Sequence, residues 1–226
     1  MERHFVHELE LLKTNLIKMG SLAEHAVAES MRAFIECHKD IAQQVLDQDW
    51  QINSYEITID NAVVDLLALH QPVATDLRFI LAASKISNDL ERIGDHAVNI
   101  AESAMHCADL PATMGSSDDI SQMAQITKGM LRDAIDGFIH KDPSKCKDVL
   151  RSDDTIDDLN RKVAHDLVKI MRKDVGSIDR AMELIRISRN LERIADLATN
   201  ISEEVIYMAD AQVIKHHFAD KRGAGH

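Results

Sequence analysis

The sequence predicts an all-α protein built as two tandem, pseudo-symmetric three-helix bundles. Three observations lead to this fold class. Hydrophobic residues make up 45% of the 226 residues but aromatic residues only 4%, and the chain holds only 8 glycines and 3 prolines. This composition favours helices over a sheet. Apolar residues also recur at heptad-like steps through long stretches, and one such stretch occurs twice.

The duplicated stretch reads D-L-E-R-I-G-D-H-A-V-N-I-A-E at residues 89–102 and N-L-E-R-I-A-D-L-A-T-N-I-S-E at residues 190–203. Aligning the copies pairs Glu91 with Glu192 and Asp95 with Asp196. At about 100° per residue, the acidic and amide positions of each copy fall on one narrow stripe almost opposite the apolar seam. The two stripes are therefore predicted to lie on the outer faces of two equivalent helices.

The first repeat is expected to contain three helices, at residues 3–38, 41–71 and 74–109. Apolar residues at helical spacing define each seam. The second helix is predicted to break near residues 47–49 and to end before Pro72, because proline biases the preceding residue away from helical geometry. The third helix carries the first acidic stripe. Residues 1–109 are thus assigned to the first bundle.

Residues 110–117 contain Pro111 and Gly115 and form the most linker-like stretch of the chain, which places the bundle boundary there. A helix is then expected at residues 118–140. The dipeptide Asp142-Pro143 has the pattern of an N-cap followed by a first-turn proline, and it predicts a helix up to about Lys173.

The last helix is expected after a turn at residues 174–177, and it carries the second acidic stripe up to about residue 211. Residues 118–211 are assigned to the second bundle, and residues 212–226, which lack an apolar seam, to a flexible tail. The repeats also align earlier in the chain, pairing Asp49 with Asp153 and Asn53 with Asp157. This alignment predicts an irregularity near Ser152.

Charge and cysteine content exclude several classes of protein. The formal net charge is -12, which predicts weak affinity for the phosphate backbones of nucleic acids. Direct nucleic-acid binding is therefore not expected. The three cysteines are far apart in the sequence, which argues against a disulfide framework and a thiolate zinc site. There is no signal-peptide pattern and no run of about 20 apolar residues. A soluble, cytoplasmic protein is expected, which reaches a membrane only through partners.

The acidic stripes are the candidate functional feature. Like charges one helical turn apart destabilise an isolated helix by about 0.2–0.5 kcal/mol, and a bound cation would offset this cost. Carboxylate oxygens from two adjacent helices suit Mg, Mn or Fe ions. The predicted metal ligands are Glu91, Asp95, Glu56 and Asp60 in the first repeat and Glu192, Asp196, Asp153 and Asp157 in the second, with Asn99 and Asn200 as further ligands or as groups that hydrogen-bond to ligands.

The second site is expected to be poorer, because Asn160 and Ala164 stand where Glu56 and Asp60 stand in the first repeat. Two other interpretations remain open. In the first, the molecule is a structural scaffold and the stripes serve only to solvate its helices. Alternatively, clustered metals could clamp a phosphoryl group in a metalloenzyme such as a phosphohydrolase. No glutamate has a histidine three positions on, and the chain has no H-E-x-x-H, no phosphate-binding G-x-x-x-x-G-K loop and no nucleophile paired with a base.

The motifs together resemble those of the phosphate-specific transport accessory protein PhoU family. The resemblance rests on the E-R-I-G-D and E-R-I-A-D pair, the duplicated three-helix layout, and the segment H-Q-P-V-A-T-D-L-R at residues 70–78, and it extends from about Phe5 to Met208. It implies two three-helix bundles, a homodimer, and metal clusters held by acidic motifs that fall on Glu91/Asp95 and Glu192/Asp196, with Glu56/Asp60 fitting the same pattern.

The resemblance also implies a function. Members of this family are cytosolic negative regulators of the phosphate-starvation response, and under this hypothesis the chain is expected to have no catalytic residues and no turnover of its own. They link the ATPase subunit of the phosphate ABC transporter to a membrane sensor histidine kinase. A metal-binding adaptor that keeps the kinase in its phosphatase state when phosphate is plentiful is therefore the leading functional hypothesis from the sequence.

Overall fold

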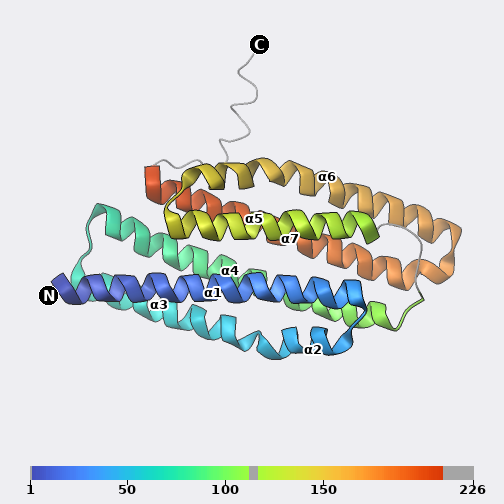
Figure 1. The fold of residues 1–226 in the computed structure, drawn as a ribbon, viewed down its shortest axis with the longest axis horizontal. Coiled ribbons are helices and arrows are strands. Elements are labelled where there is room, and N and C mark those ends of the chain that lie inside the picture. The colour runs from blue at the N-terminus through green and yellow to red at the C-terminus, as the bar shows by residue number, and fades with distance from the viewer. Residues whose placement is uncertain (1, 112–116, 211–226) are drawn as a thin grey trace, which may run out of the picture.

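The computed structural model describes residues 2–111 and 117–210, and every regular element in these ranges is helical (Figure 1). The elements are α1 (Glu2–Glu36), α2 (Lys39–Gln48), α3 (Trp50–His70), α4 (Ala74–Ala108), α5 (Ser117–His140), α6 (Pro143–Lys173), the short 3-10 helix η1 (Val175–Ser177) and α7 (Ile178–Asp210).

The helices form two three-helix bundles, which confirms the predicted fold class. The first bundle contains α1, the α2–α3 pair and α4, and the second contains α5, α6 and α7. The bundles lie side by side along their lengths, because α4 packs against α7 and α1 packs against α5 (Figure 1). The division into residues 1–109 and 118–211 as separate domains stays a prediction, and the predicted tail at residues 212–226 lies outside the described residues.

The predicted apolar seams form the core. On α4 the seam residues from Ile86 to Ile100 are at most 2% exposed, and on α7 those from Ile187 to Ile201 are fully buried. Each buried Leu or Ile side chain stabilises the fold by about 1.5–3 kcal/mol relative to leaving it in water. Helical periodicity therefore located the core of both repeats correctly.

The predicted break in the second helix occurs at Asp49, between α2 and α3. There the backbone N–H of Ile52 donates to the carbonyl oxygen of Asp49 at 3.0 Å, which is the tighter i,i+3 pattern. The irregularity expected at the equivalent place in the second repeat is absent, because α6 runs unbroken from Pro143 to Lys173. The Ser152 hydroxyl donates to the carbonyl oxygen of Asp148 at 3.1 Å, inside that regular helix.

Other helix ends follow from local chemistry. The Asp142 carboxylate accepts hydrogen bonds from the Ser144 backbone N–H at 2.9 Å and hydroxyl at 2.6 Å, so Asp142 is the N-cap that the sequence predicted. Gln71, just before Pro72, adopts a left-handed conformation with φ 47°, and this ends α3. The chain then turns back into α4.

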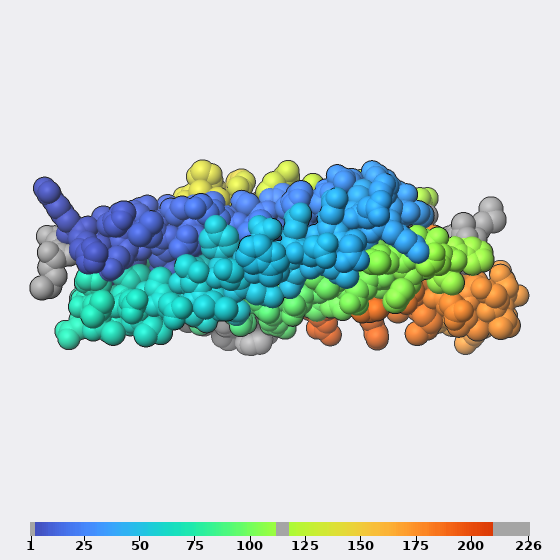
Figure 2. Space-filling view, turned by 90° about the horizontal axis from the view of Figure 1, so that it is seen from below, coloured from blue at the N-terminus to red at the C-terminus, as the bar shows by residue number. Residues whose placement is uncertain are grey.

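α4 and α7 run antiparallel at the centre of the molecule and are related by an approximate two-fold rotation. Lys85 near the start of α4 contacts Glu204 near the end of α7, whereas Glu102 near the end of α4 contacts Arg186 near the start of α7. α1 and α5 lie on one side of this pair. Figure 2 shows α1 along one edge of the molecule and side chains of α7 along the opposite edge.

The surface opposite α1 and α5 is called the α4–α7 face here, and it consists of α3, α4, α7 and α6 in that lateral order. The outer strip of α4 lies between α3 and α7, since Ser84 bonds to Asp60 of α3 and the adjacent Lys85 bonds to Glu204 of α7. Among the described residues, no helix has both the length and the apolar character needed for a membrane span.

Candidate cation-binding site

The first acidic cluster lies on the α4–α7 face, between α4 and the α2–α3 junction. α4 contributes Glu91 and Asp95, which are one turn apart on its outer strip, the former half-buried and the latter exposed. Asp49 comes from the helix break and Glu56 from α3. The charges of Asp95, Glu56 and Asp49 all act on Glu91. These four carboxylates are hereafter the first cluster.

Burial and mutual repulsion make the first cluster electrostatically unfavourable. Burial raises the pKa of Glu91, and the charges of Asp95, Glu56 and Asp49 raise it further, whereas Arg92 opposes the shift. Burial likewise raises the pKa of Asp49, against a lowering hydrogen bond from Asn53. A cation placed among these groups would relieve the repulsion that raises both pKa values.

Two oxygen atoms at the first cluster, one of Asp49 and one of its neighbour Asn53, are buried without a hydrogen-bond partner. The Asn53 amide donates to Asp49 Oδ2 at 3.0 Å, but Asp49 Oδ1 and Asn53 Oδ1 are unpaired. A cavity of about 40 Å³ adjoins Asp49 and is also lined by Gly94 and His25. Buried oxygens without a donor cost about 1–3 kcal/mol each, so both are suited to accept from a water molecule or to ligate a cation.

Gly94 brings α4 close to the helix break. A Cβ atom at this position would lie 2.9 Å from Ile52 Cδ1 and 3.4 Å from Asp49 Oδ1. The equivalent position of the second repeat holds Ala195, which is buried. The missing side chain therefore lets the α2–α3 junction carry Asp49 up to the acidic stripe of α4.

The second acidic cluster occupies the equivalent place between α6 and α7, and consists of Asp153, Asp157, Glu192 and Asp196. The pKa of Asp153 is raised to about 6, chiefly by burial and then by the charges of Asp196 and Asp157. Burial also raises the pKa values of Glu192 and Asp196. The four carboxylates predicted as ligands in the second repeat thus influence one another.

Arginines partly neutralise the second cluster. Arg193 lies 3.3 Å from Asp196 and 3.6 Å from Glu192, and Arg161 lies 4.0 Å from Asp157. Position 160, where the sequence suggested a weakness, holds an asparagine whose Oδ1 accepts a hydrogen bond from the Ser188 hydroxyl at 2.6 Å. Asn160 is therefore engaged within the bundle.

Three of the predicted ligands lie elsewhere. Asp60 accepts a hydrogen bond from Ser84 at 3.4 Å, two helical turns along α4 from Glu91. Asn99 Oδ1 accepts from Arg186 at 3.0 Å, and its amide donates to the Asp95 backbone. Asn200 lines a shallow groove on the α4 side of α7 together with Lys85. The structure does not bring these side chains to the two clusters.

Sequence reasoning missed Asp49, a member of the first cluster, and Asn53, which donates a hydrogen bond to it. The signal was present in the internal alignment, because the donors chosen in the second repeat, Asp153 and Asp157, pair with these two residues. The choice of Glu56 and Asp60 instead followed the i,i+4 spacing of acids. Because α3 runs antiparallel to α4, Asp60 meets Ser84, two turns from Glu91, whereas Asp49 lies beside Gly94, the residue before Asp95.

The donor chemistry of both clusters fits hard cations, since it consists of carboxylate and amide oxygens. Within residues 2–111 and 117–210, however, no three His, Cys, Asp or Glu side chains converge as a ready-made chelate. An ion would therefore require the carboxylates to turn toward one another, with water completing its coordination.

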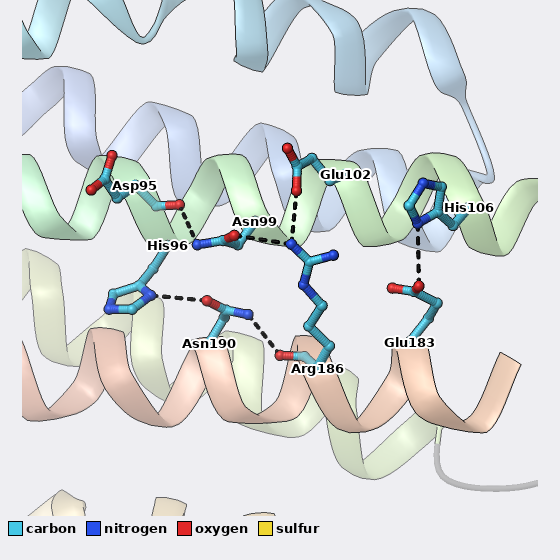
Figure 3. A network of polar contacts seen from close by, with 8 residues as sticks. All are labelled: Asp95, His96, Asn99, Glu102, His106, Glu183, Arg186 and Asn190. Atoms are coloured by element: carbon cyan, nitrogen blue, oxygen red, sulfur yellow. Dashed lines mark hydrogen bonds and ion pairs between the residues drawn. The ribbon is translucent and has the colours of Figure 1, made fainter. Parts of the chain in front are cut away.

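A polar network joins the two repeats beside the clusters (Figure 3). Arg186 of α7 donates to Glu102 at 2.7 Å and to Asn99, and Asn190 of α7 contacts His96 at 2.9 Å. Figure 3 shows the Asp95 carboxylate on the side of α4 away from α7. Asn99 and Glu102 of the predicted outer stripe of α4 thus bind the other repeat.

The fold and the site define a class: a tandem-repeat helical protein with an acidic cluster on each repeat of one face. The family model described as the PhoU domain matches this chain twice, at residues 16–104 and 120–205, once per bundle. The chain belongs to the PhoU family.

Similar proteins and solved structures support the same family. The chain is 38% identical to a phosphate-specific transport system accessory protein PhoU homolog of Pseudomonas putida, over 96% of this chain and 84% of that protein. It is 36% identical to the homolog of Aquifex aeolicus, over 96% and 97% of the two chains. The crystal structure of PhoU from Pseudomonas aeruginosa superposes with a TM-score of 0.90 at 36% identity, covering 92% of this chain and all of that one.

A more distant structure has the same fold. The phosphate transport system regulatory protein PhoU from Streptococcus pneumoniae matches with a TM-score of 0.86 at 26% identity, covering 93% of this chain and 99% of that one. The helical architecture of this chain is thus shared with both solved structures.

Proposed function

We propose that this chain is a regulatory accessory protein of a phosphate-specific transport system. The observation that carries the proposal is that the PhoU domain matches both repeats. Relatives at 36–38% identity bear the name of phosphate-specific transport accessory proteins, and a solved relative is described as a regulatory protein of phosphate transport.

In this proposal the two acidic clusters bind divalent or ferric cations such as Mg, Mn or Fe. The first donor set is Asp49, Glu56, Glu91 and Asp95, and the second is Asp153, Asp157, Glu192 and Asp196. The raised carboxyl pKa values and the unpaired oxygens of Asp49 and Asn53 support it. The ions would neutralise repelling carboxylates and fix the outer surface of each repeat.

The chain acts as an adaptor, and its proposed location is the cytoplasm. It links the ATPase subunit of the phosphate ABC transporter to a sensor histidine kinase, and it keeps the kinase in the phosphatase state when phosphate is plentiful. It functions as a homodimer and negative regulator, and turns over no substrate of its own. This mechanism uses the α4–α7 face as a contact surface and requires no nucleophile.

Cation binding is tested by elemental analysis of protein purified without added metal. The variant Glu91→Ala/Asp95→Ala is expected to lose about half of the bound metal while it keeps its helical circular dichroism, because the second cluster is left intact. The matched control Glu10→Ala/Asp65→Ala removes two exposed carboxylates outside the clusters and should retain wild-type metal content. Metal-free wild-type protein that also fails to bind added Mn²⁺ would contradict this part of the proposal.

The adaptor role is tested with a phosphate-starvation reporter and by pull-down. Cells lacking this chain should express the reporter even in high phosphate, and the wild-type chain should restore repression. Tagged protein should recover the transporter ATPase subunit and the sensor kinase. Recovery of neither protein, or phosphoester turnover by the purified chain with Mg²⁺, Mn²⁺ or Fe, would count against a non-enzymatic adaptor.

A further inference from the structure

Exposed large apolar side chains gather at the hairpin end of each repeat. Among the described residues of the second repeat, all of the exposed large apolar side chains lie where α6 turns into α7. In the first repeat, five lie where α3 turns into α4. Single exposed apolar residues are ordinary, but their concentration at one place in both repeats is not.

Three of these positions are equivalent between the repeats. The alignment that pairs Glu91 with Glu192 also pairs Leu77 with Ile178 and Leu81 with Met182, and the alignment of Asp49 with Asp153 pairs Val64 with Val168. Their exposed fractions run from 36% to 64%. The first apolar trio is therefore Val64, Leu77 and Leu81, and the second is Val168, Ile178 and Met182.

The members of a trio are neighbours on the surface. Asp60 of α3 contacts Ser84 of α4, and the two helices run in opposite directions. Val64 lies one turn after Asp60 on α3, and Leu81 lies one turn before Ser84 on α4, so these two residues are neighbours. Leu77 lies one turn before Leu81 on the same strip of α4. Each trio is thus one contiguous apolar patch, and Leu81 and Met182 lie about 15 Å along α4 and α7 from Glu91 and Glu192.

Both trios lie on the α4–α7 face, at opposite ends of the molecule. His106 contacts Glu183 at 3.2 Å, so Met182 lies level with His106 on the long axis. The rise from Leu81 to His106 then separates the trios by about 38 Å. Because the approximate two-fold axis passes through the crossing of α4 and α7, the two patches have equivalent orientations toward anything that approaches this face.

Charge decides which occupant fits. The strip between the trios carries both carboxylate clusters, and their eight carboxylates outnumber the basic groups beside them, Arg92 at the first cluster and Arg161 and Arg193 at the second. A second copy of this chain, docked face to face, would place acid against acid. A partner with lysine or arginine beside its apolar contacts is complementary.

We infer that the α4–α7 face docks on a two-fold symmetric homodimer, whose subunits each place an apolar cluster flanked by basic residues on one trio. Each chain then binds one partner dimer through two equivalent contacts, and a homodimer of this chain binds two partner dimers, so that the ratio of chains to partner dimers is one in either case. The identity of the partner rests on the proposed adaptor function, whereas the binding surface and the symmetry follow from the two trios.

Binding is measured with two purified probes, the dimeric ATPase subunit of the phosphate transporter and the dimeric cytoplasmic part of the sensor kinase. Leu81→Gln and Met182→Gln remove apolar contacts from exposed positions, one in each trio. Ile35→Gln is the matched control, because Ile35 is 59% exposed on α1 and lines the groove between α1 and α5. Leu81→Met/Met182→Leu keeps both patches apolar.

Each single variant should bind at least one of the probes about ten-fold more weakly, and the double variant about 100-fold or more, since bivalent contacts reinforce each other. Ile35→Gln and the apolar double swap should bind like wild type, with one chain per partner dimer by light scattering. Wild-type affinity of Leu81→Gln/Met182→Gln, or two chains per dimer, would overturn the docking mode while leaving the adaptor role intact. Wild-type protein that binds neither probe would overturn both.

Discussion

Lys85 and Arg186 occupy equivalent positions in the two repeats, and each crosses to a carboxylate of the other repeat. Lys85 Nζ lies 3.0 Å from Glu204 Oε1, and Arg186 lies 2.7 Å from Glu102 Oε2. The two basic residues are therefore related by the pseudo-symmetry of the interface, whereas their acceptors are not, because Glu102 aligns with Glu203 and Lys85 contacts Glu204. The pairs differ in burial, because the Glu204 side chain is 4% exposed and that of Glu102 is 42% exposed.

This difference predicts that removing the two basic side chains lowers the free energy of unfolding by unequal amounts. Lys85→Ala should lower the free energy of unfolding by about 1–2 kcal/mol, because a buried carboxylate loses a charged partner. Arg186→Ala should cost less than about 1 kcal/mol, since Glu102 stays hydrated. Urea unfolding followed by circular dichroism measures both. An equal or reversed order would show that burial of Glu204 is not what sets the cost.

The second acidic cluster predicts a stability that declines as pH rises through the weakly acidic range. The pKa of Asp153 is raised from 3.8 to about 6 by burial and neighbouring carboxylates. The folded state therefore holds its proton to higher pH than the unfolded state does. Unfolding free energy attributable to this group falls between about pH 4 and pH 6 in cation-free buffer.

Asp153→Asn should remove this decline. At pH 7 this variant should have a free energy of unfolding higher than that of the wild type by on the order of 1 kcal/mol, after allowance for partial solvent exposure. At pH 4 the free energy of unfolding should change little. Urea titrations at both pH values in the presence of a chelator provide the measurement. A gain of the same size at pH 4 would assign the effect to packing instead of charge.

Asp49 and Asp60 should differ in their effect on cation binding. Asp49 belongs to the first cluster and has a buried, unpaired oxygen, so Asp49→Asn is expected to weaken Mn²⁺ binding there by about ten-fold or more. Asp60 contacts Ser84, which lies two helical turns from Glu91, so Asp60→Asn should leave Mn²⁺ binding unchanged. Calorimetric Mn²⁺ titration compares them, and equal losses would rule out the register described above.

Gly137 and Gly129 of α5 provide a matched pair for packing. A Cβ at Gly137 would lie 2.5 Å from Cys146 Sγ, whereas one at Gly129 would meet nothing within 4 Å. Gly137→Ala should destabilise the fold by about 1–3 kcal/mol, and Gly129→Ala should stabilise it by about 0.5–1 kcal/mol through helix propensity. Thermal unfolding gives both values. Adding Cys146→Ala to Gly137→Ala should recover part of the loss, and no recovery would place the strain elsewhere.

The acidic positions show where sequence reasoning succeeded and where it stopped. Glu91 and Asp95 must share a helix face, because spacing along one helix is fixed by 3.6 residues per turn. Which residue of α3 meets them depends on the register between two antiparallel helices, and that register is set by the break at Asp49 and by the close approach at Gly94. Asp60 has the i,i+4 spacing from Glu56 that suggested a ligand pair, but the register between α3 and α4 places it at Ser84 and not at Glu91.

The sequence by itself determined the all-α class, the duplication, the apolar seams and the helix ends at Pro72 and Asp142, because these depend on local periodicity and backbone chemistry. Only the tertiary structure decided that α4 and α7 cross as an antiparallel pair, that Asn99 turns to Arg186, and that apolar trios accompany the acids on one face. Contacts between distant segments depend on how whole helices pack, and helical spacing along one segment carries no information about the neighbour it will meet.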